Sequence, residues 1–551
     1  MARMRRRYVP DRWIFGPDLT DSIGSCAASG GVQNTNPMRH TFRKIVIAAD
    51  RSGAGKTTVS CGLLAVLKKR SVKVQSFKCG PDYIDPMFHR RVLGVPSGNL
   101  DSFFTDDVTL RRIFRARVVE SGAELALVEG VMGYYDGLGG VSSRASTWEI
   151  AHILDAPTIL VLDAKGASVS IAALVRGMMQ FKEEREVQSG IRGLILNRVS
   201  PMFYPRLKSV IEEYCPGIEV LGYLPELPEL QVPSRHLGLV EPAEIEDFQR
   251  WTERVAAQME ESVEVERLLE IAGVDVLNIP QTQGNAAFVQ PVTCRAMEDE
   301  DSERSTVEAE ISGTDAVLAA PDKASSAMNG LKCRARALER PVRIAVSEDE
   351  AFNFTYEENR ALLRQLGAEL VPFSPLHDAA LPADTDGLLL SGGYPELYKD
   401  ALHANASMRA SVAEAVRQGL PTIAECGGYM YLLDAIEQVP MCGVLTGDAE
   451  RKPRLVRFGY VEAETRRDSV LGPAGTVLRG HEFHRYDCDF NGADCTLTKP
   501  AAGHGRAATS ARSYEGIYLT DSLAAGFPHF YYWSNPAALT HFLDACRTWR
   551  K

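Results

Sequence analysis

The sequence lacks three features, and each absence excludes a class of protein. No apolar run approaches the roughly 20 residues that a membrane-spanning helix needs, so we expect a soluble chain with no membrane partner. The 11 cysteines include no C-x-x-C pair, which argues for reduced thiols in the cytoplasm and against a disulfide framework. Acidic residues outnumber basic ones, 72 to 61, and the net charge of −11 argues against nucleic-acid binding, because phosphate contacts need a basic surface.

The length and composition favour a multidomain globular protein. A chain of 551 residues exceeds what one hydrophobic core usually supports, and 45% hydrophobic with 24% charged residues is ordinary for a globular fold. A stretch rich in Gln, Thr, Ser and Ala, with an acidic patch and no periodicity, is typical of a linker. We expect a flexible extension over 1–40, a first domain over 41–278, a partly disordered linker over 279–341 and a second domain over 342–551.

Both domains alternate short apolar strands with helical stretches, which predicts two doubly wound α/β domains built on parallel sheets. The expected strands are Ile45–Ala49, Val72–Phe77, Leu125–Glu129, Thr158–Asp163 and Gly193–Asn197, followed in the second domain by Val342–Val346, Ala368–Phe373 and Gly387–Leu390. Ligands of such sheets bind beyond the carboxyl ends of the strands. Polar residues at those ends are therefore the candidates for function.

A phosphate-binding loop follows the first expected strand. Its candidate ATP-binding residues are Gly53, Gly55, Lys56, Thr57 and Thr58. A helix that begins near Lys56 would offer free N–H groups to an anion, the lysine would contact the β- and γ-phosphates, and the Thr57 hydroxyl would bind Mg²⁺. The strict P-loop pattern wants glycine at position 50, where this chain has Asp50, so the match is imperfect.

Carboxylates follow the next strands. Lys78, Asp82 and Asp85 share a loop held by glycine and two prolines, which fits a metal and anion site, although turn chemistry alone would also explain Gly-Pro-Asp. Glu129 ends an apolar strand at the place where P-loop folds keep the acid that helps to hold Mg²⁺. Asp136, a little further along, is a weaker candidate for the same region.

Three further polar residues of the first domain have two interpretations each. The amide of Asn197 suits the edge of a purine, and a turn cap explains it almost as well. Arg235 and His236 lie in a polar turn where they would meet substrate carboxylates or serve a structural role.

The second domain predicts a cysteine nucleophile. Gly392 and Gly393 follow a strand and leave backbone N–H groups to face an oxyanion. Cys426 and Gly427 stand between a strand and a helix, an elbow that exposes a nucleophile at a helix N-terminus, where the dipole lowers a thiol pKa. We favour His529 as its base; His481 and His484 are the other candidates, with a substrate-facing, ammonia-path or structural role.

Together these motifs resemble the cobyrinic acid a,c-diamide synthase family of cobalamin biosynthesis. The resemblance covers roughly residues 43–551 apart from the linker. It is carried by S-G-A-G-K-T-T at 52–58, K-C-G-P-D-Y-I-D at 78–85, E-G-V-M-G at 129–133, R-H-L-G-L at 235–239, S-G-G-Y-P-E at 391–396 and E-C-G-G at 425–428. It implies an N-terminal P-loop domain of the dethiobiotin-synthetase type and a C-terminal class I glutamine amidotransferase-like domain.

The resemblance also implies a reaction and its participants. ATP would phosphorylate the a and c acetate carboxylates of a corrin in turn, and ammonia from L-glutamine would displace each phosphate, with a homodimer as one allowed assembly. The implied roles are ATP binding for Gly53, Gly55, Lys56, Thr57, Thr58, Lys78 and Asn197; Mg²⁺ binding for Thr57, Glu129 and Asp82 or Asp85; catalysis for Cys426 and His529; oxyanion or glutamine contact for Gly392, Gly393 and Gly427; and substrate contact for Asp136, Arg235 and His236.

Two departures from the pattern keep alternatives open. Many amidotransferases place a Glu two residues after the catalytic His, where this chain has Tyr531, and Asp50-Arg51 replace residues that are often Thr and Gly. Nickel-sirohydrochlorin or hydrogenobyrinic acid a,c-diamide synthase would show the same motifs. From another class, a P-loop ATPase switch with a regulatory amidotransferase-like domain would need neither Cys426 nor His529.

Overall fold

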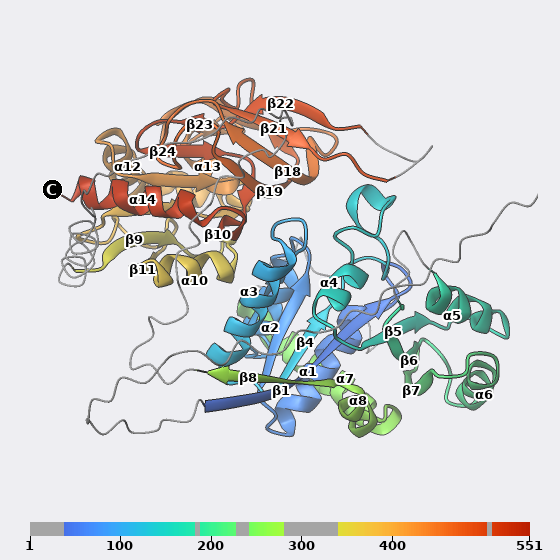
Figure 1. Ribbon diagram of the computed structural model, residues 1–551. Coiled ribbons are helices and arrows are strands. Elements are labelled where there is room, and N and C mark those ends of the chain that lie inside the picture. The colour runs from blue at the N-terminus through green and yellow to red at the C-terminus, as the bar shows by residue number, and fades with distance from the viewer. Residues whose placement is uncertain (1–37, 182–187, 227–241, 280–339, 504–509, 551) are drawn as a thin grey trace, which may run out of the picture.

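The structure is a computed structural model that describes residues 38–181, 188–226, 242–279, 340–503 and 510–550. Two α/β domains follow one another along the chain, and the C-terminal one, yellow to red, lies above the N-terminal one (Figure 1). This confirms the predicted fold class. The candidate substrate residues Arg235 and His236 lie outside the described residues. Among the helices that the structure describes, none has the length and apolar character required to span a bilayer.

The N-terminal domain is built on one eight-stranded sheet with the order β3-β2-β4-β1-β5-β6-β7, in which neighbouring strands are parallel, and β8 pairs antiparallel with the first half of β1. The strands are β1 (Met38–Ala49), β2 (Val74–Cys79), β3 (Ser97–Leu100), β4 (Leu125–Glu129), β5 (Thr158–Asp163), β6 (Ile191–Asn197), β7 (Glu219–Leu224) and β8 (Gly273–Ile279).

Helices cover both faces of this sheet, as a parallel sheet requires. One face packs against α1 (Lys56–Lys69), α2 (Ile84–Arg91), α7 (Pro242–Ser262) and α8 (Val265–Ile271). The other packs against α3 (Asp107–Ser121), α4 (Thr147–Ile153), α5 (Ser170–Gln180) and α6 (Tyr204–Tyr214). The strand residues between these layers are almost fully buried.

The observed strands differ from the expected ones at their edges. β1 begins at Met38, three residues inside the stretch expected to be a flexible extension, because its first half pairs with β8. β8 ends at Ile279, one residue into the expected linker. β3 was not expected, since Ser-Gly-Asn-Leu is not an apolar run, and its burial comes partly from the second domain.

The C-terminal domain has a six-stranded sheet with the order β11-β9-β12-β14-β24-β23. Its strands are β9 (Val342–Ser347), β11 (Ala368–Phe373), β12 (Gly387–Leu390), β14 (Thr422–Glu425), β23 (Tyr518–Leu519) and β24 (Leu523–Gly526), and its helices are α10 (Glu357–Gln365), α11 (Lys399–Ala404), α12 (Ala406–Arg417), α13 (Gly427–Leu432) and α14 (Pro536–Trp549). Beside it, β10 (Phe352–Phe354) pairs with β13 (Gly392–Gly393).

A second, antiparallel sheet extends this domain in the order β22-β21-β18-β19-β25. Its strands are β18 (Arg457–Thr465), β19 (Val477–His484), β21 (Cys495–Lys499), β22 (Arg512–Gly516) and β25 (His529–Phe530); a smaller sheet joins β15 (Leu433–Ile436), β16 (Val439–Pro440), β17 (Leu445–Arg451) and β20 (Tyr486–Asp487).

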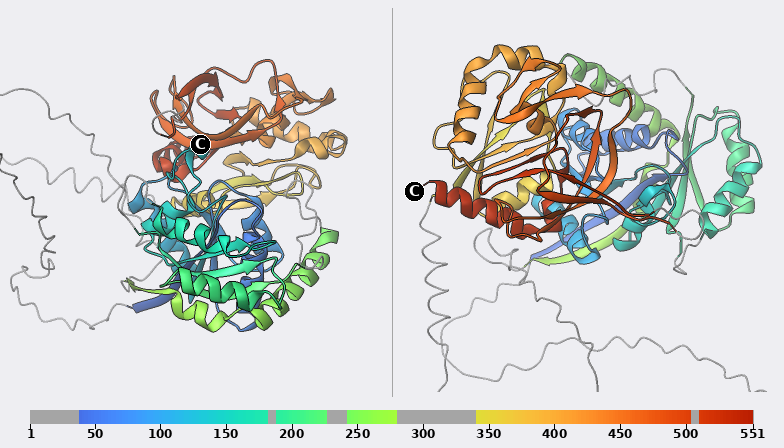
Figure 2. Two further views of the ribbon diagram at one scale, coloured as in Figure 1. Left: turned by 90° about the vertical axis from the view of Figure 1, so that its right-hand side faces the viewer. Right: turned by 90° about the horizontal axis from the view of Figure 1, so that it is seen from above.

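The two domains contact each other closely, and the left view of Figure 2 shows the C-terminal domain above the N-terminal one. The backbone N–H of Asn99 in β3 donates to Oε1 of Glu358 in α10 at 3.1 Å. The rings of Phe103 and Tyr460 stack with centroids 4.4 Å apart. Tyr83, in the loop after β2, lies against aromatic rings of the C-terminal domain, so the two candidate sites approach each other across this interface.

Candidate active site

The phosphate loop connects β1 to α1. Gly53 and Gly55 have φ of 76° and 105°, a region that favours glycine. A Cβ on Gly55 would lie 2.1 Å from Nδ2 of Asn197, so the close packing of this side chain also requires glycine. The helix begins at Lys56 with no side-chain cap at Gly55, which leaves its first N–H groups available to an anion.

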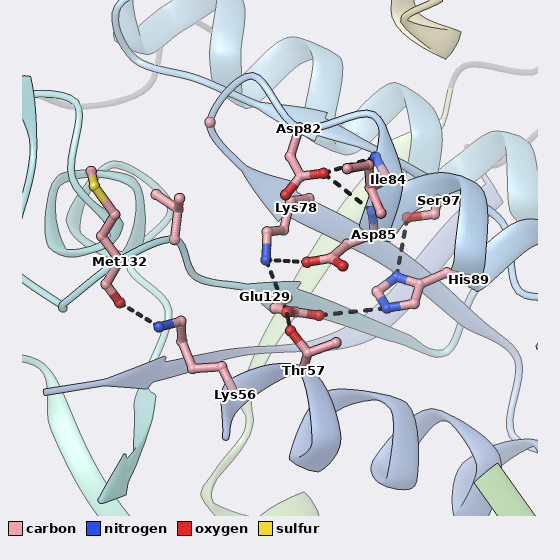
Figure 3. Close-up of polar contacts among 12 residues, drawn as sticks. Lys56, Thr57, Lys78, Asp82, Ile84, Asp85, His89, Ser97, Glu129 and Met132 are labelled. Carbon is pink, nitrogen blue, oxygen red and sulfur yellow. Dashed lines mark hydrogen bonds and ion pairs between the residues drawn. The ribbon is translucent and has the colours of Figure 1, made fainter. Parts of the chain in front are cut away.

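Lys56 points into this region. Its Nζ donates to the backbone oxygen of Met132, in the loop after β4, and lies 3.4 Å from the oxygen of Arg51 (Figure 3). Burial and the nearby charge of Lys78 lower the pKa of Lys56 to about 8. A bound phosphate would oppose both effects, so the site is arranged for an anionic ligand.

Charged side chains from three elements meet beside the loop (Figure 3). Thr57 Oγ1 donates to Glu129 Oε1 at 3.0 Å. Lys78 Nζ donates to the same oxygen at 2.9 Å and to Asp85 Oδ2 at 2.6 Å. Burial alone would raise the pKa of Glu129, but the charge of Lys78 and the contact with His89 hold it below its ordinary value. Glu129 is therefore a fixed anion.

His89 is a neighbour of this cluster that sequence reasoning missed. Its fully buried ring places Nε2 3.5 Å from Glu129 Oε2 and Nδ1 2.8 Å from Ser76 Oγ. A signal was available: Asp85 and His89 are four residues apart in α2 and so share one helix face.

Asp82 and Asp136 have backbone roles. Asp82 Oδ1 accepts from the N–H groups of Ile84 and Asp85 at 2.8 and 3.1 Å, which fits the alternative interpretation of this loop as turn chemistry. Burial and the charge of Asp85 raise the pKa of Asp82 to about 6. Asp136 Oδ2 accepts from the N–H of Gly133 at 2.9 Å.

The oxygens of Thr57 and Glu129 fit a magnesium ion that is held mainly by phosphate. The described residues contain no cluster of three or more His, Cys, Asp or Glu side chains that could enclose a metal. Mg²⁺ bound with a nucleotide needs only one or two protein oxygens in addition to phosphate oxygens and waters. The hydroxyl and carboxylate at 3.0 Å supply such a pair.

Other predicted residues hold the loop in shape. Asn197 Nδ2 donates to the oxygen of Ala54 at 2.9 Å, so its amide contacts the loop backbone. Arg51, at one of the two positions that depart from the pattern, contacts both Asp50 and Asp163 at the end of β5.

The second candidate site surrounds Cys426. This residue has φ 49° and ψ −104°, a strained conformation between β14 and α13 that matches the predicted elbow. A Cβ on Gly427 would lie 3.0 Å from the N of Gly393, and one on Gly392 would lie 2.2 Å from Cε1 of His529. These close approaches bring the nucleophile, the two-glycine strand β13 and the histidine together.

The predicted lowering of the thiol pKa was wrong. Burial raises the pKa of Cys426 well above its ordinary value, and the nearby carboxyl of Glu396 adds to the effect. The thiol is therefore neutral, and a base must remove its proton during the reaction.

Of the three candidate histidines, His529 lies against the two-glycine strand β13. Burial, together with His484, lowers the pKa of His529 to about 3, so its ring is neutral near pH 7. His481 Nδ1 lies 3.0 Å from the hydroxyl of Tyr356. His484 Nδ1 lies 2.7 Å from the oxygen of Tyr486, with its ring stacked on Phe527. His481 and His484 thus have structural partners.

Comparisons with known proteins cover both domains. Residues 45–240 match a CobQ/CobB/MinD/ParA nucleotide binding domain, and residues 343–537 match a CobB/CobQ-like glutamine amidotransferase domain. A cobyrinate a,c-diamide synthase of Listeria innocua is 36% identical over 510 residues, which are 92% of this chain and 99% of that protein. A protein of the same name from Salmonella typhimurium and a hydrogenobyrinate a,c-diamide synthase of Streptomyces coelicolor are each 36% identical, with 92% and 98% of the two chains covered.

Proposed function

This chain belongs to the cobyrinate a,c-diamide synthase family, and on that premise we propose that it amidates the a and c acetate carboxylates of cobyrinic acid. The two matched domains make it a glutamine-dependent ligase with ATP as cosubstrate. The choice of substrate class rests on the similarity to cobyrinate a,c-diamide synthases, which extends over nearly the full length of this chain and of those relatives. The residues of both the phosphate loop and the cysteine elbow are present.

In the proposed first step a substrate carboxylate attacks the γ-phosphorus of ATP. An acyl phosphate forms and ADP leaves. Lys56 and Lys78 offset the charge of the transferring group, and the N–H groups at the start of α1 hold the phosphates. Mg²⁺, held by Thr57 and Glu129, would add charge neutralisation at the phosphate oxygens.

In the proposed second half-reaction Cys426 attacks the side-chain amide of glutamine. His529 takes the thiol proton and passes it to the leaving ammonia, and a glutamyl thioester remains. Backbone N–H groups of Gly392, Gly393 and Gly427 would stabilise the oxyanion, and water then hydrolyses the thioester. The ammonia attacks the carbonyl carbon of the acyl phosphate. Inorganic phosphate departs, and the amide is the product.

Several finer assignments belong to the same proposal. Asp136, Arg235 and His236 would contact the substrate. Magnesium would be the metal, the enzyme would work in the cytoplasm without a nucleic-acid partner, and a homodimer is one assembly compatible with the chain. Sedimentation at several protein concentrations tests the last of these directly.

A second candidate substrate is hydrogenobyrinic acid, favoured by the relative of that name, which is as similar as the others. The deciding experiment supplies cobyrinic acid, hydrogenobyrinic acid and nickel-sirohydrochlorin separately with ATP and glutamine, and measures initial rates and product masses. We expect the a,c-diamide of cobyrinic acid to form fastest. Faster turnover of another tetrapyrrole would overturn the choice of substrate. Absence of glutamine hydrolysis with every tetrapyrrole would instead favour the ATPase switch.

A further inference from the structure

The antiparallel sheet of the C-terminal domain carries an exposed aromatic pair that the steps above do not use. Phe458 on β18 and Phe483 on β19 are directly opposed in the strand register, with ring centroids 5.7 Å apart and planes at 69°. Their side chains nevertheless remain 69% and 52% exposed. Single exposed apolar residues are ordinary, but two adjacent phenylalanine rings form a patch that suggests a binding surface.

This pair faces the N-terminal domain. Side chains alternate along a strand, so Phe458 shares a face with Tyr460, and Phe483 shares it with His481. Tyr460 donates its hydroxyl to Asp101 Oδ2 at 2.8 Å across the domain interface. The aromatic pair is thus the next position on the same face, one step beyond the contact.

The contacts along β19 show which part of the N-terminal domain lies opposite. Arg479 Nη1 donates to the oxygen of Phe103, which follows β3. Two residues later, the His481 ring is 5.6 Å from the ring of Tyr83, which follows β2. In the parallel sheet, β4 is next after β3 and β2. Phe483, two residues further on, therefore lies toward the loop that follows β4.

The loop after β4 also contacts the antiparallel sheet of the C-terminal domain near β21, which lies on the opposite side of β18 from β19. A Cβ on Gly139 would lie 2.9 Å from the Cβ of Ala502, which follows β21. The same loop contains Met132, whose backbone oxygen accepts from Lys56 Nζ. Phe458 and Phe483 thus face the carboxyl ends of the strands of the N-terminal sheet, where the phosphate site lies.

We propose that Phe458 and Phe483 form a platform for the flat macrocycle of the tetrapyrrole substrate. This inference rests on the proposed function. A tetrapyrrole has a broad apolar face with carboxylates around its rim, and an aromatic surface beside a cationic phosphate site matches that distribution. With its face on the two rings, an acetate on the rim reaches toward Lys56 and the γ-phosphate.

The test is the double variant F458A/F483A in the full-length protein. Loss of two ring contacts should raise the KM for cobyrinic acid by about 10-fold or more, and a titration of its absorbance should show the same weakening. The KM for ATP should not change. Phe490→Ala is the matched control, because Phe490 is 57% exposed and packs on Tyr518 instead.

Each outcome distinguishes this inference from the proposed function. If wild-type protein binds no tetrapyrrole, the proposed function fails. If wild type binds but the double variant binds equally well, or Phe490→Ala weakens binding as much, the platform is wrong. A wild-type dimer that dissociates in the double variant would show that the pair contacts a second copy, which also overturns the inference. If the alanine variant unfolds at a lower temperature than wild type, two further double variants replace it. F458Y/F483Y keeps both rings and should bind cobyrinic acid as wild type does, whereas F458K/F483K removes both rings and should bind it more weakly.

Tyr531 stands two residues after His529, where many amidotransferases have the glutamate that orients the catalytic histidine. The Tyr531 side chain points into the domain interface, where its hydroxyl lies 3.5 Å from the oxygen of Asn99. Glu425, the residue before the nucleophile, places Oε2 4.0 Å from His529 Nδ1. Within the described part of the chain this buried Nδ1 has no hydrogen-bond partner.

Glu425 is itself held in place. Its Oε1 accepts from the hydroxyl of Tyr532 at 2.9 Å and from the N–H of Phe530 at 3.3 Å. These two donors flank the position that an orienting acid usually occupies after the histidine. The carboxylate therefore reaches the ring from the neighbouring strand β14, since β14 and the segment before β25 lie side by side.

We infer that Glu425 is the positioning residue for His529. By accepting a hydrogen bond from Nδ1–H it would fix the ring tautomer, leave Nε2 to take the thiol proton, and stabilise the imidazolium that forms. Catalytic bonds are often long before substrate binds, so 4.0 Å is compatible with this role.

Glu425→Gln tests this role. The kcat for glutamine hydrolysis should fall about 100-fold or more with little change in KM, while amidation with added ammonia continues. Tyr532→Phe, which removes one donor to the carboxylate, should give a smaller loss, and Glu425→Asp should recover part of the rate. Equal loss of the glutamine and ammonia routes would indicate a merely structural role, and an unchanged kcat would remove Glu425 from the mechanism.

The pH profile adds a readout that folding would not produce. Burial raises the pKa of Glu425 to about 7. The titratable groups around it are His529, Tyr532, the Cys426 thiol and the phenols Tyr83 and Tyr356. The wild-type rate should therefore rise with pH through about 7 as the carboxylate ionises, and Glu425→Gln should lack this rise. The same rise in the variant would contradict the inference.

Discussion

The phosphate site, around Lys56, Lys78 and Glu129, and the thiol site, around Cys426 and His529, differ in the charge of their side chains. At the phosphate site, Lys78 donates to both Asp85 and Glu129, and despite burial its charge holds the pKa of Glu129 below the ordinary value. At the thiol site, burial raises the pKa of Cys426 and lowers that of His529 to about 3, so both groups are neutral. One site acts through charges that are already fixed, and the other must create its charge pair during the reaction.

The largest expected effect separates the two sites completely. Cys426→Ala removes the nucleophile, so glutamine hydrolysis and glutamine-dependent amidation should be lost. Amidation with added ammonia should continue, because the phosphate site is untouched. Product formation with each nitrogen donor measures this. Loss of both routes would mean that the cysteine supports the fold or the ATP half.

The reverse change should affect both nitrogen donors alike. Lys56→Ala removes a cation from the phosphate site, and amidation should fall by about 10²- to 10³-fold with glutamine or with ammonia. Initial rates at saturating ATP and tetrapyrrole measure it. A variant that lost activity only with glutamine would break the comparison, since it would tie Lys56 to the thiol site.

A stability experiment tests whether the charges at the phosphate site are fixed. Lys78→Met leaves the buried carboxylates of Asp85 and Glu129 without their cation, and the free energy of unfolding of the N-terminal domain should fall by about 3 kcal/mol. The matched control is Lys69→Ala, which breaks an exposed pair with Glu260 and should have a much smaller effect, because solvent screens that pair. Denaturant titration compares the two. Equal losses would show that the buried cluster has no special energetic role.

The smallest expected effect is a proton taken up on ATP binding. Because the pKa of Lys56 is lowered to about 8, part of this lysine is neutral near pH 9, and bound phosphate should favour its charged form. ATP binding should therefore take up a fraction of a proton at high pH and almost none from this group near pH 7. Calorimetry in buffers of different ionisation enthalpy measures the uptake. Lys56→Arg, which stays charged, should abolish it, and proton release by wild type would contradict the sign.

The strands that carry the sites could be predicted because their apolar runs are buried on both faces. β4, β5 and β12 begin and end at the expected residues. The motif residues at their ends come together for the same reason, since parallel strands share one edge. The nucleotide-binding and amidotransferase domains could be named from short motifs alone, and the comparisons confirm them.

Features that depend on contacts between distant segments could not be predicted. The thiol pKa was misjudged because the local helix was visible in the sequence, whereas the burial of Cys426 comes from the folded domain. In the sequence Glu425 is only one letter of the E-C-G-G motif, because nothing local shows that its carboxylate turns toward a histidine about a hundred residues later. The metal role of Asp82 stays a prediction; the structure shows its carboxylate accepting from two N–H groups in the first turn of α2, a contact that the sequence alone did not separate from metal binding.

The short strand β3 has a consequence for how the chain avoids aggregation. It is the edge strand of the N-terminal sheet, and an unpaired edge can recruit strands from other molecules. The C-terminal domain covers it with side chains: Glu358 accepts from the N–H of Asn99, and Tyr531 donates to its oxygen. The C-terminal domain thus also protects the edge strand β3 of the N-terminal domain. An N-terminal domain produced alone would expose that edge.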